Sequence, residues 1–297
     1  MIKRTLFFGN PAYLSTKNEQ LLVSFPDEKP DKFVPIEDIG IIILENQQIT
    51  ITNGLLAKLT SQKVAVVSCN AQHLPNGLLL PMHGHTEQTE RIRHQLGVSV
   101  PLKKNLWQQT VSSKIRNQAG LLSEKGKPNQ KLLYLAKNVS SGDVGNHEAL
   151  AAAYYWQNLF SVSEFSRHQG GIPPNNLLNY GYAILRAVIA RALVSSGLLP
   201  NVGIWHRNKY NAYCLADDIM EPYRPFVDLV VSHIVETEDD IAEVTPILKK
   251  ELLQIPALDV RIDGQKSPLM VAASRTTSSL YDCYLGISRK IIYPEYG

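Results

Sequence analysis

The stretch Leu80-Pro-Met-His-Gly-His85 separates two parts of this sequence that differ in pattern. Before it, short runs of β-branched and aromatic residues alternate with turn residues, as strands and their connections do. After it, apolar residues recur at helical spacing over longer segments. The stretch itself combines proline, glycine and polar residues, which is typical of a linker. We therefore predict an α+β fold with a small β-rich N-terminal domain over residues 1–80, a linker at 81–86, and a larger all-helical C-terminal domain over 87–297.

The N-terminal part is predicted to form a small sandwich or two-sheet unit, because it carries many short strands with turn residues between them. The run Ile39–Leu44 is almost entirely isoleucine, as expected of a strand buried on both faces. Asn53 is a suitable N-cap for a short helix. We expect a helix at 53–59 and strands at 5–8, 12–16, 21–25, 32–35, 39–44, 49–52 and 63–68.

The C-terminal part is predicted to be helical from the spacing of its apolar residues. Its longest apolar stretch with helical spacing, Tyr180 to Leu199, contains Arg186 and Arg191, so a helix buried in the core suits it better than a membrane span. Gly197, just past that helix, is a C-terminal stop signal. The helices are expected at 86–96, 101–122, 129–136, 145–160, 175–196 and 241–253.

Size and cysteine content restrict the class of protein. The chain has 297 residues, 44% of them hydrophobic, which is enough to build a substantial core. Its three cysteines, Cys69, Cys214 and Cys283, are far apart in the sequence. This excludes a disulfide scaffold and a cysteine-rich zinc module, and it favours a reduced, cytoplasmic protein. Because the longest apolar stretch is assigned to a core helix, no membrane association is expected.

Charge is distributed unevenly along the chain. Thirty Lys and Arg against 27 Asp and Glu give a net charge of +3, which argues against a uniformly basic surface. Residues 88–138 nevertheless carry ten basic residues against two acids, and residues 215–251 carry ten acids against three basic residues. The basic segment is predicted to contact the phosphate backbone of DNA, although a solvated helix face would have the same pattern. The candidate DNA contacts are Lys103, Lys104, Lys114, Arg116, Arg167, Lys209 and Arg224.

The acidic segment follows His206 and contains candidate metal ligands. Asp218 and Glu221 are three residues apart, so on a helix they share one face and repel each other unless a cation lies between them. That cation is either Arg224 or a divalent metal, and carboxylates with one imidazole favour Mg²⁺ or Mn²⁺. Along an unbroken helix His206 and Glu221 would lie about 22 Å apart. The chain must therefore turn back near residues 208–211 for one ion to reach both.

A third ligand has to come from elsewhere in the chain, and Glu148 is the leading candidate. It precedes an alanine-rich segment that can pack closely against a neighbouring helix. An acid in the first turn of a helix is also favoured by the helix dipole, which alone would explain it. The local sequence leaves both roles open for Glu148.

Four motifs then occur in an order that is characteristic of one family. They are Asn176-Leu-Leu-Asn-Tyr-Gly-Tyr-Ala-Ile-Leu185, Gly197-Leu-Leu-Pro200, Gly203-Ile-Trp-His206 and Asp218-Ile-Met-Glu-Pro-Tyr-Arg-Pro225, with Glu148 upstream. In this ordered set the chain resembles the Cas-one integrase and endonuclease family of CRISPR adaptation, in its type II branch. The resemblance covers essentially the whole chain.

The resemblance implies a metal-dependent DNA integrase and endonuclease of antiviral defence. Glu148, His206 and Glu221 match the family's catalytic residues, which bind Mg²⁺ or Mn²⁺, and Asp218 matches an additional acid. Asp217, next to it, leaves the supporting role ambiguous. In the family a DNA 3′-hydroxyl attacks a phosphodiester of the CRISPR repeat, so that a new spacer is inserted.

The resemblance also implies partners: double-stranded spacer and repeat DNA, a second copy of the chain, the small Cas-two protein, and other type II adaptation proteins. The N-terminal domain is expected to make dimer or partner contacts. Two further interpretations of the residues stay open. Another divalent-metal phosphodiesterase would share the ligands without a DNA surface, and a non-catalytic DNA-binding assembly protein would bind DNA without a metal requirement.

Overall fold

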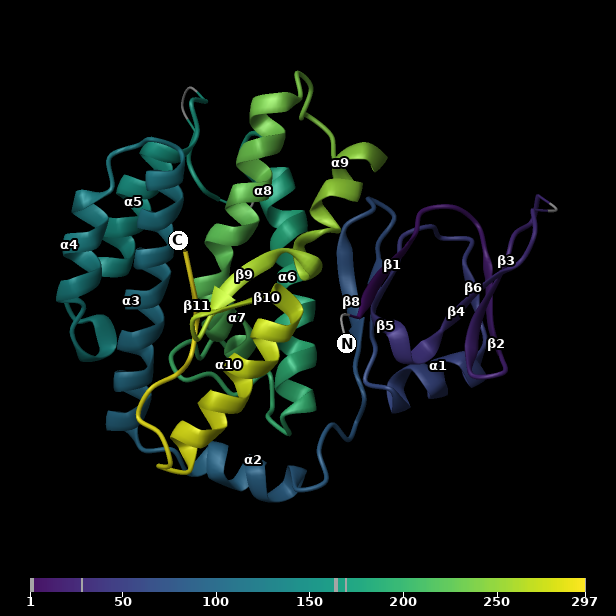
Figure 1. The fold of residues 1–297 in the computed structure, drawn as a ribbon, viewed down its shortest axis with the longest axis horizontal. Coiled ribbons are helices and arrows are strands. Elements are labelled where there is room, and N and C mark those ends of the chain that lie inside the picture. Colours follow the sequence, from purple (N-terminus) through teal and green to yellow (C-terminus); the bar gives the residue numbers. More distant parts are fainter. Residues whose placement is uncertain (1–2, 28, 163–164, 169, 297) are drawn as a thin grey trace. The chain divides into compact units, whose positions relative to one another are not determined.

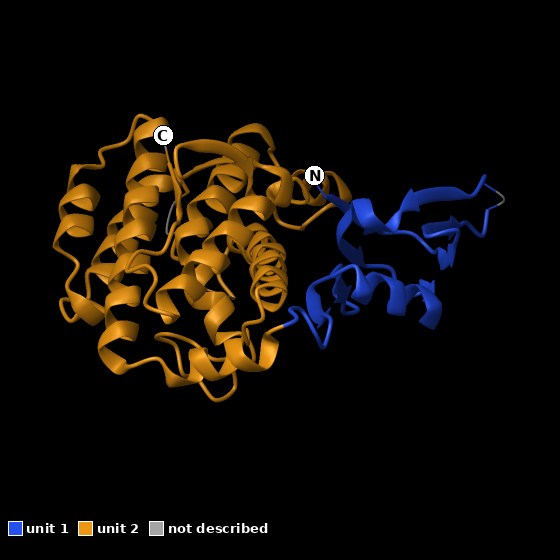
Figure 2. Ribbon diagram, turned by 60° about the horizontal axis from the view of Figure 1, so that its bottom comes forward, with its two compact units in different colours: residues 1–86 blue, residues 87–297 orange. Residues whose placement is uncertain are grey.

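Residues 3–27, 29–162, 165–168 and 170–296 are described in a computed structural model of the chain. The chain divides into two compact units, residues 1–86 and residues 87–297 (Figure 2). The first unit is rich in strands and the second is mainly helical, which confirms the predicted α+β class.

The first unit contains two four-stranded sheets and one helix. One sheet has the order β1 (Arg4–Phe8), β5 (Ile39–Leu44), β7 (Ala65–Cys69) and β8 (Pro75–Leu79). Its first three strands are parallel, and β8 is antiparallel to β7. The other sheet has the order β4 (Lys32–Pro35), β3 (Gln20–Ser24), β2 (Tyr13–Lys17) and β6 (Thr50–Ile51). The 3-10 turn η1 (Ile36–Asp38) and helix α1 (Asn53–Ser61) complete the unit. This agrees with the predicted two-sheet unit, to which β8 is an addition.

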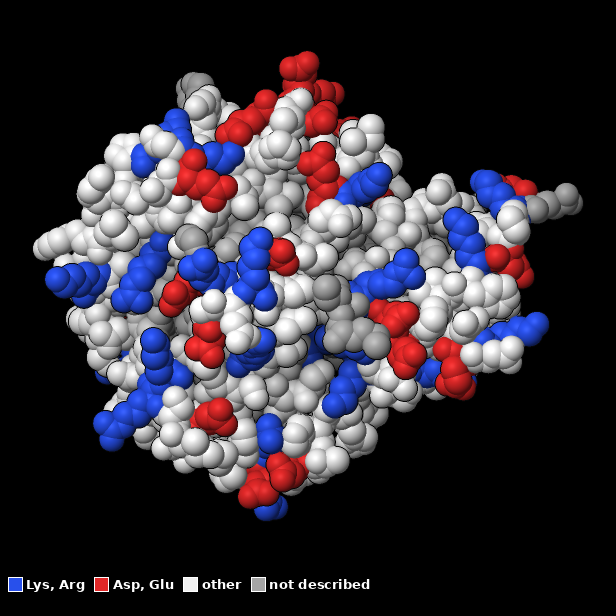
Figure 3. Space-filling model, in the orientation of Figure 1, with Lys and Arg blue, Asp and Glu red and all other residues white. Residues whose placement is uncertain are grey.

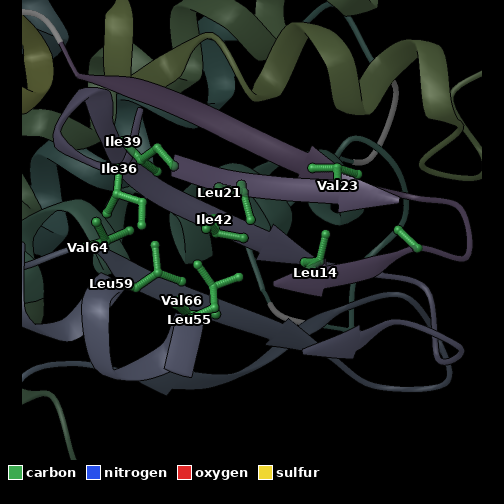
Figure 4. Packing of buried hydrophobic residues seen from close by; sticks show 11 residues of the cluster. Leu14, Leu21, Val23, Ile36, Ile39, Ile42, Leu55, Leu59, Val64 and Val66 are labelled. Carbon is green, nitrogen blue, oxygen red and sulfur yellow. The ribbon is translucent and has the colours of Figure 1, made fainter. Parts of the chain in front are cut away.

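The core of the first unit combines side chains from both sheets and from α1 (Figure 4). Ile42 of β5, Leu21 of β3 and Leu55 of α1 are completely buried within it. All five residues from 39 to 43 are buried, as predicted for a strand covered on both faces. The N-cap of α1 is Thr52 rather than Asn53, because the Thr52 hydroxyl accepts a hydrogen bond from the Leu55 amide at 3.3 Å.

The second unit is built around nine α-helices and three 3-10 turns of the described chain, together with a small sheet (Figure 1). The longer helices are α2 (Gln88–Gly97), α3 (Val100–Glu124), α4 (Gln130–Asn138), α5 (His147–Leu159), α6 (Asn175–Ser195), α8 (Arg224–Thr237) and α10 (Leu269–Tyr284). The shorter ones are α7 (Cys214–Met220), α9 (Pro246–Leu252) and the 3-10 turns η2 (Ser141–Asp143), η3 (Glu221–Tyr223) and η4 (Ile255–Ala257).

Helix α6 is the core helix of the second unit. Of the described helices it alone is long and apolar enough to cross a membrane, yet 78% of that apolar window is buried inside the protein. Helices α7, α8 and α10 pack against it. Gly181 lets α8 approach, because a Cβ at this position would overlap the side chain of Val227. Helix α6 is therefore a buried core helix, as predicted.

The second unit is not entirely helical, because it also carries a three-stranded antiparallel sheet. The strand order is β10 (Gln265–Pro268), β9 (Asp259–Ile262) and β11 (Pro294–Glu295). Asp263 and Gly264 connect β9 to β10 with positive φ angles of 50° and 71°. This is the backbone conformation that Asp-Gly hairpins favour, and it was not part of the prediction.

Candidate active site

His206 lies in a loop that a buried carboxylate of α7 holds in place. Asp218 is completely buried, and its Oδ1 lies 2.6 Å from the His206 Nδ1. The same carboxylate accepts hydrogen bonds from the backbone amides of Ile204, Trp205 and His206, at 2.7, 3.0 and 3.2 Å. The chain turns back at residues 208–211, where the Asn211 amide donates to the Asn208 carbonyl. The turn expected there is confirmed.

Gly203 allows this close approach of the loop to α7. A Cβ at Gly203 would overlap both the His206 carbonyl oxygen and the Asp218 carboxylate. Trp205 stacks on Trp107 of α3 with ring centroids 5.5 Å apart, and the rings of Trp107 and His206 make a T-shaped contact. The loop is thus fixed by Asp218 on one side and by α3 on the other.

Glu148 stands in the first turn of α5, and its position is fixed by an upstream acid. The Asp143 carboxylate accepts the backbone amides of His147 and Glu148, both at 2.9 Å, and so caps the start of the helix. The Glu148 side chain is 26% exposed and is directed toward α3, where its Oε1 accepts a hydrogen bond from Lys114 at 2.7 Å.

Glu221 follows α7 directly and is buried. Pro222 and Pro225 lack the amide hydrogen that a continuous helix needs, and the chain passes from α7 to α8 through the 3-10 turn η3. The Glu221 Oε2 lies 2.6 Å from the same Lys114 Nζ, and its Oε1 accepts a hydrogen bond from the Arg224 Nε at 2.8 Å. One ammonium group therefore lies between carboxylates from two different elements.

These charges shift the titration of the site. Burial would raise the pKa of Glu221, but Arg224 and Lys114 outweigh it and hold that pKa at about 2. Burial would lower the pKa of Lys114, but the charges of Glu221 and Glu148 leave it above its ordinary value. Lys114 is therefore an ammonium and Glu221 a carboxylate at neutral pH.

The pKa of His206 is shifted by Asp218 and by the same carboxylates, Glu221 and Glu148. The hydrogen bond to Asp218 raises the pKa of His206, and the negative charges of Glu221 and Glu148 act in the same direction. Because the Asp218 carboxylate can only accept, the Nδ1 carries the proton and the Nε2 is left for another partner. No three His, Cys, Asp or Glu side chains of the described residues are arranged closely enough to hold a metal ion as they stand.

Two cavities adjoin these residues. The first, of about 710 Å³, borders His206 and is lined by the basic side chains of Lys103, Arg207 and Lys209. The second, of about 240 Å³, borders Glu221 and is lined by Lys114, Gln118, Ala152, Trp156, Arg167, Tyr182, Arg224 and Asp228. The first cavity is suited to phosphate groups, since its charged lining is cationic.

Asp228 is a buried acid of the second cavity that the sequence did not single out. Its carboxylate accepts hydrogen bonds from the hydroxyls of Tyr155 and Tyr182, at 2.8 and 2.5 Å. Burial raises the pKa of Asp228 to about 6, despite these hydrogen bonds and the nearby charges of Arg224 and Arg167. No local sequence pattern indicates this cluster, because Tyr155, Tyr182 and Asp228 lie on three different helices, α5, α6 and α8.

The candidate DNA contacts fall into two groups. Lys104, Arg116 and Lys209 are exposed and Lys103 is half-buried, whereas Lys114 and Arg224 are occupied by ion pairs with Glu148 and Glu221. Arg167 donates to Asn175 and Asn179. Figure 3 shows Lys and Arg side chains over α3 and α4, and acidic side chains gathered at the end of α8.

Asp217 and Asp218 have separate partners. Asp217 accepts hydrogen bonds from Arg186 and Asn211, both at 2.7 Å, and does not take part in the contacts of His206 given above. Asp218 is the acid that orients His206. The site thus brings together Glu148 and Glu221 through Lys114, with His206 and Asp218 as a second pair.

Comparison with known proteins identifies related chains. Residues 6–241 match the sequence model of the family described as CRISPR associated protein Cas1. The chain is 40% identical over 281 residues to the CRISPR-associated endonuclease Cas1 of Neisseria meningitidis serogroup C. The aligned region covers 94% of this chain and 91% of that protein.

Solved structures share the fold across nearly the full chain. A casposase bound to integration product is similar with a TM-score of 0.77 at 19% identity, over 98% of this chain and 92% of that chain. A chain of a Cas6-RT-Cas1–Cas2 complex is similar with a TM-score of 0.74 at 19% identity, over 99% of this chain and 36% of that chain.

Proposed function

The chain belongs to the family of the CRISPR-associated protein Cas1, and on this basis we propose that it is a metal-dependent DNA endonuclease and integrase that inserts spacers into CRISPR repeats. One observation carries the proposal: Glu148 and Glu221, from separate elements, converge on a single cationic group beside the oriented His206. The name of the Neisseria relative, an endonuclease, and the integration product of the casposase structure support the reaction class.

Glu148, His206 and Glu221 are the residues that we propose hold Mg²⁺ or Mn²⁺. Their chemistry fits such an ion, because carboxylate oxygens of Glu148 and Glu221 already share one cation, the Lys114 ammonium, in a largely buried position. His206 would coordinate through Nε2, since Asp218 occupies its Nδ1. When bound, the metal would polarise the reacting phosphate and lower the pKa of the attacking hydroxyl.

The protein's own residues prepare this reaction. Arg224 keeps Glu221 ionised, and Asp218 keeps the His206 ring in one orientation. Lys103 and Lys209, which line the cavity beside His206, would hold DNA phosphates near the reacting one. In the step itself the 3′-oxygen forms a bond to phosphorus and loses its proton, while the existing ester bond breaks and its oxygen leaves with a proton.

We further propose double-stranded spacer and repeat DNA, a second copy of the chain and a Cas2 protein as partners in the cytoplasm. A chain of similar fold belongs to a Cas6-RT-Cas1–Cas2 complex, which supports the Cas2 partnership. The three free, buried cysteines are compatible with a reducing compartment.

A strand-transfer assay tests the proposal. A labelled double-stranded oligonucleotide with free 3′-hydroxyls is incubated with repeat-containing DNA, the protein and Mn²⁺ or Mg²⁺. Glu148→Gln, His206→Ala and Glu221→Gln are expected to lower product by at least about a hundredfold, because each removes a proposed ligand. Glu236→Gln and His233→Ala change an exposed acid and an exposed histidine and serve as matched controls.

Three results would contradict the proposal. Wild-type rates of strand transfer in all three site variants would remove the site assignment. Metal-dependent cleavage of small phosphodiesters without any transfer to DNA would favour the alternative phosphodiesterase, and DNA binding without phosphodiester chemistry would favour a non-catalytic assembly protein.

A further inference from the structure

The ammonium of Lys114 occupies the place between Glu148 and Glu221 where the proposed function needs a metal ion. Its Nζ lies 2.7 Å from Glu148 Oε1 and 2.6 Å from Glu221 Oε2, and only 12% of its side chain is exposed. Two carboxylates this close would repel each other in a dry site without a positive charge between them. Lys114 therefore acts as the counter-ion of Glu148 and Glu221.

A second place for this ammonium exists one helical turn away. Gln118 follows Lys114 by four residues on α3, so the two side chains are neighbours on one face. Both line the cavity of about 240 Å³, together with the carboxylate of Asp228. Gln118 is only 3% exposed, and its Oε1 accepts no hydrogen bond from any residue that the structure describes.

A buried amide oxygen without a donor costs free energy, and native proteins rarely tolerate one without a reason. The Gln118 Oε1 is an acceptor, and Lys114 has three N–H donors on a flexible four-carbon stem. The cavity offers room for the stem to swing toward this acceptor. The unsatisfied oxygen is thus explained if it receives Lys114 in a second state of the site.

We propose that Lys114 is a two-position residue: it pairs with Glu148 and Glu221 when no metal is bound, and it moves to Gln118 in the adjoining cavity when a divalent cation enters. The inference rests on the proposed function for the identity of the metal ligands. It makes Lys114 a positioning residue, which keeps both carboxylates in place, and not a DNA contact.

The proposal has a direct consequence for metal affinity. Because the metal must displace the ammonium, the apparent dissociation constant is the intrinsic one divided by the fraction of molecules in which Lys114 has moved. If that fraction is below about one in ten, removing the ammonium tightens metal binding by about tenfold or more. A residue that only contacted DNA would leave metal affinity in the absence of DNA unchanged.

The experiment is a titration of the full chain with Mn²⁺ alone, without DNA, followed by electron paramagnetic resonance of the free ion. Lys114→Met is expected to bind Mn²⁺ about tenfold more tightly than wild type. Without metal, it is expected to melt at a lower temperature, because two carboxylates lose their counter-ion. Lys104→Met is the matched control. It removes an equal charge from an exposed position of the same helix, and Lys104 forms no ion pair with either carboxylate in the described structure. This variant is expected to change Mn²⁺ affinity by less than about threefold.

Gln118 provides the second half of the test. Gln118→Leu removes the acceptor for the displaced ammonium and is expected to weaken Mn²⁺ binding by about fivefold to tenfold. In a Lys114→Met background the same change is expected to have no effect, because no ammonium remains to be received. Equal effects of Gln118→Leu in both backgrounds would overturn the two-position assignment.

The outcomes separate this inference from the proposed function. If wild type binds Mn²⁺ in a manner that Glu148→Gln abolishes, but Lys114→Met binds no more tightly, the inference is wrong and the metal site stands. If neither wild type nor Lys114→Met binds Mn²⁺, both are overturned. If only Lys114→Met binds, the displacement is supported directly.

Discussion

The Oδ1 of Asp218 lies 2.6 Å from the Nδ1 of His206, and the same carboxylate accepts three backbone amides of the His206 loop. A single buried acid therefore sets both the path of the loop and the orientation of the imidazole. This relationship makes Asp218 the supporting acid of the site, whereas Asp217 pairs with Arg186 and Asn211.

Asp218→Asn should weaken Mn²⁺ binding by about tenfold to a hundredfold, because an amide cannot fix the protonated Nδ1 as a carboxylate does. It should also lower the pKa of His206, which the hydrogen bond to Asp218 raises. Paramagnetic titration measures the first effect, and NMR of the His206 ring measures the second. Asp217→Asn is the matched control, and an equal loss in both variants would contradict a specific role for Asp218.

Gly203→Ala should destabilise the second unit by about 1–3 kcal/mol, since a Cβ there overlaps the His206 carbonyl and the Asp218 carboxylate. All three tryptophans, Trp107, Trp156 and Trp205, lie in that unit, so their fluorescence reports on its unfolding alone. Gly97→Ala is the control, because no heavy atom lies within 4 Å of a Cβ at that position. An unchanged urea midpoint for Gly203→Ala would mean that the loop is not held as described.

Asp228 should make the second unit less stable as pH rises from 4 to 6. Its folded-state pKa of about 6 exceeds the ordinary 3.8, so the folded state binds more protons than the unfolded state in this window, and stability falls with increasing pH. The loss is at most about 3 kcal/mol. Urea midpoints from tryptophan fluorescence should decline with pH less steeply in Asp228→Asn than in wild type. Asp259→Asn, at an exposed site, should follow wild type, and identical slopes in all three proteins would refute the prediction.

Lys103 and Lys209 should contribute more to DNA binding than Arg116 does. The two lysines line the cavity beside His206, whereas Arg116 lines a separate groove with Arg289 and Tyr296. Each lost phosphate contact should reduce the slope of log affinity against log salt by about 0.9. Fluorescence anisotropy at several salt concentrations measures this for Lys103→Ala, Lys209→Ala and Arg116→Ala. Lys266→Ala, an exposed control, should leave the slope unchanged, and a larger effect of Arg116→Ala than of either lysine would reverse the assignment.

Local patterns were sufficient for the elements with strong periodicity. The isoleucine run of β5 and the apolar spacing of α3 and α6 predicted those elements to within a few residues, because burial on a sheet or helix face requires that spacing. Helices α8 and α10 were missed. The first begins at Arg224-Pro225 within a proline-rich motif, and the second contains runs of serine and threonine, both of which weaken a local helix signal. The dipeptide Asp263-Gly264 is typical of a β-hairpin turn, but the predicted elements included no hairpin at this position.

The sequence by itself determined the fold class, the family resemblance and the candidate residues Glu148, His206 and Glu221, because motif order and hydrophobic periodicity are properties of the chain alone. Only the tertiary structure decided which groups meet. It separated the roles of Asp217 and Asp218, and it placed Lys114 between Glu148 and Glu221 rather than on an exposed basic surface. The physical reason is that these contacts join separate elements. The contacts of Lys114 join α3, α5 and η3, and those of Asp217 and Asp218 join α7 to α6 and to the loop before α7. The packing of these elements depends on the whole core and not on any local pattern.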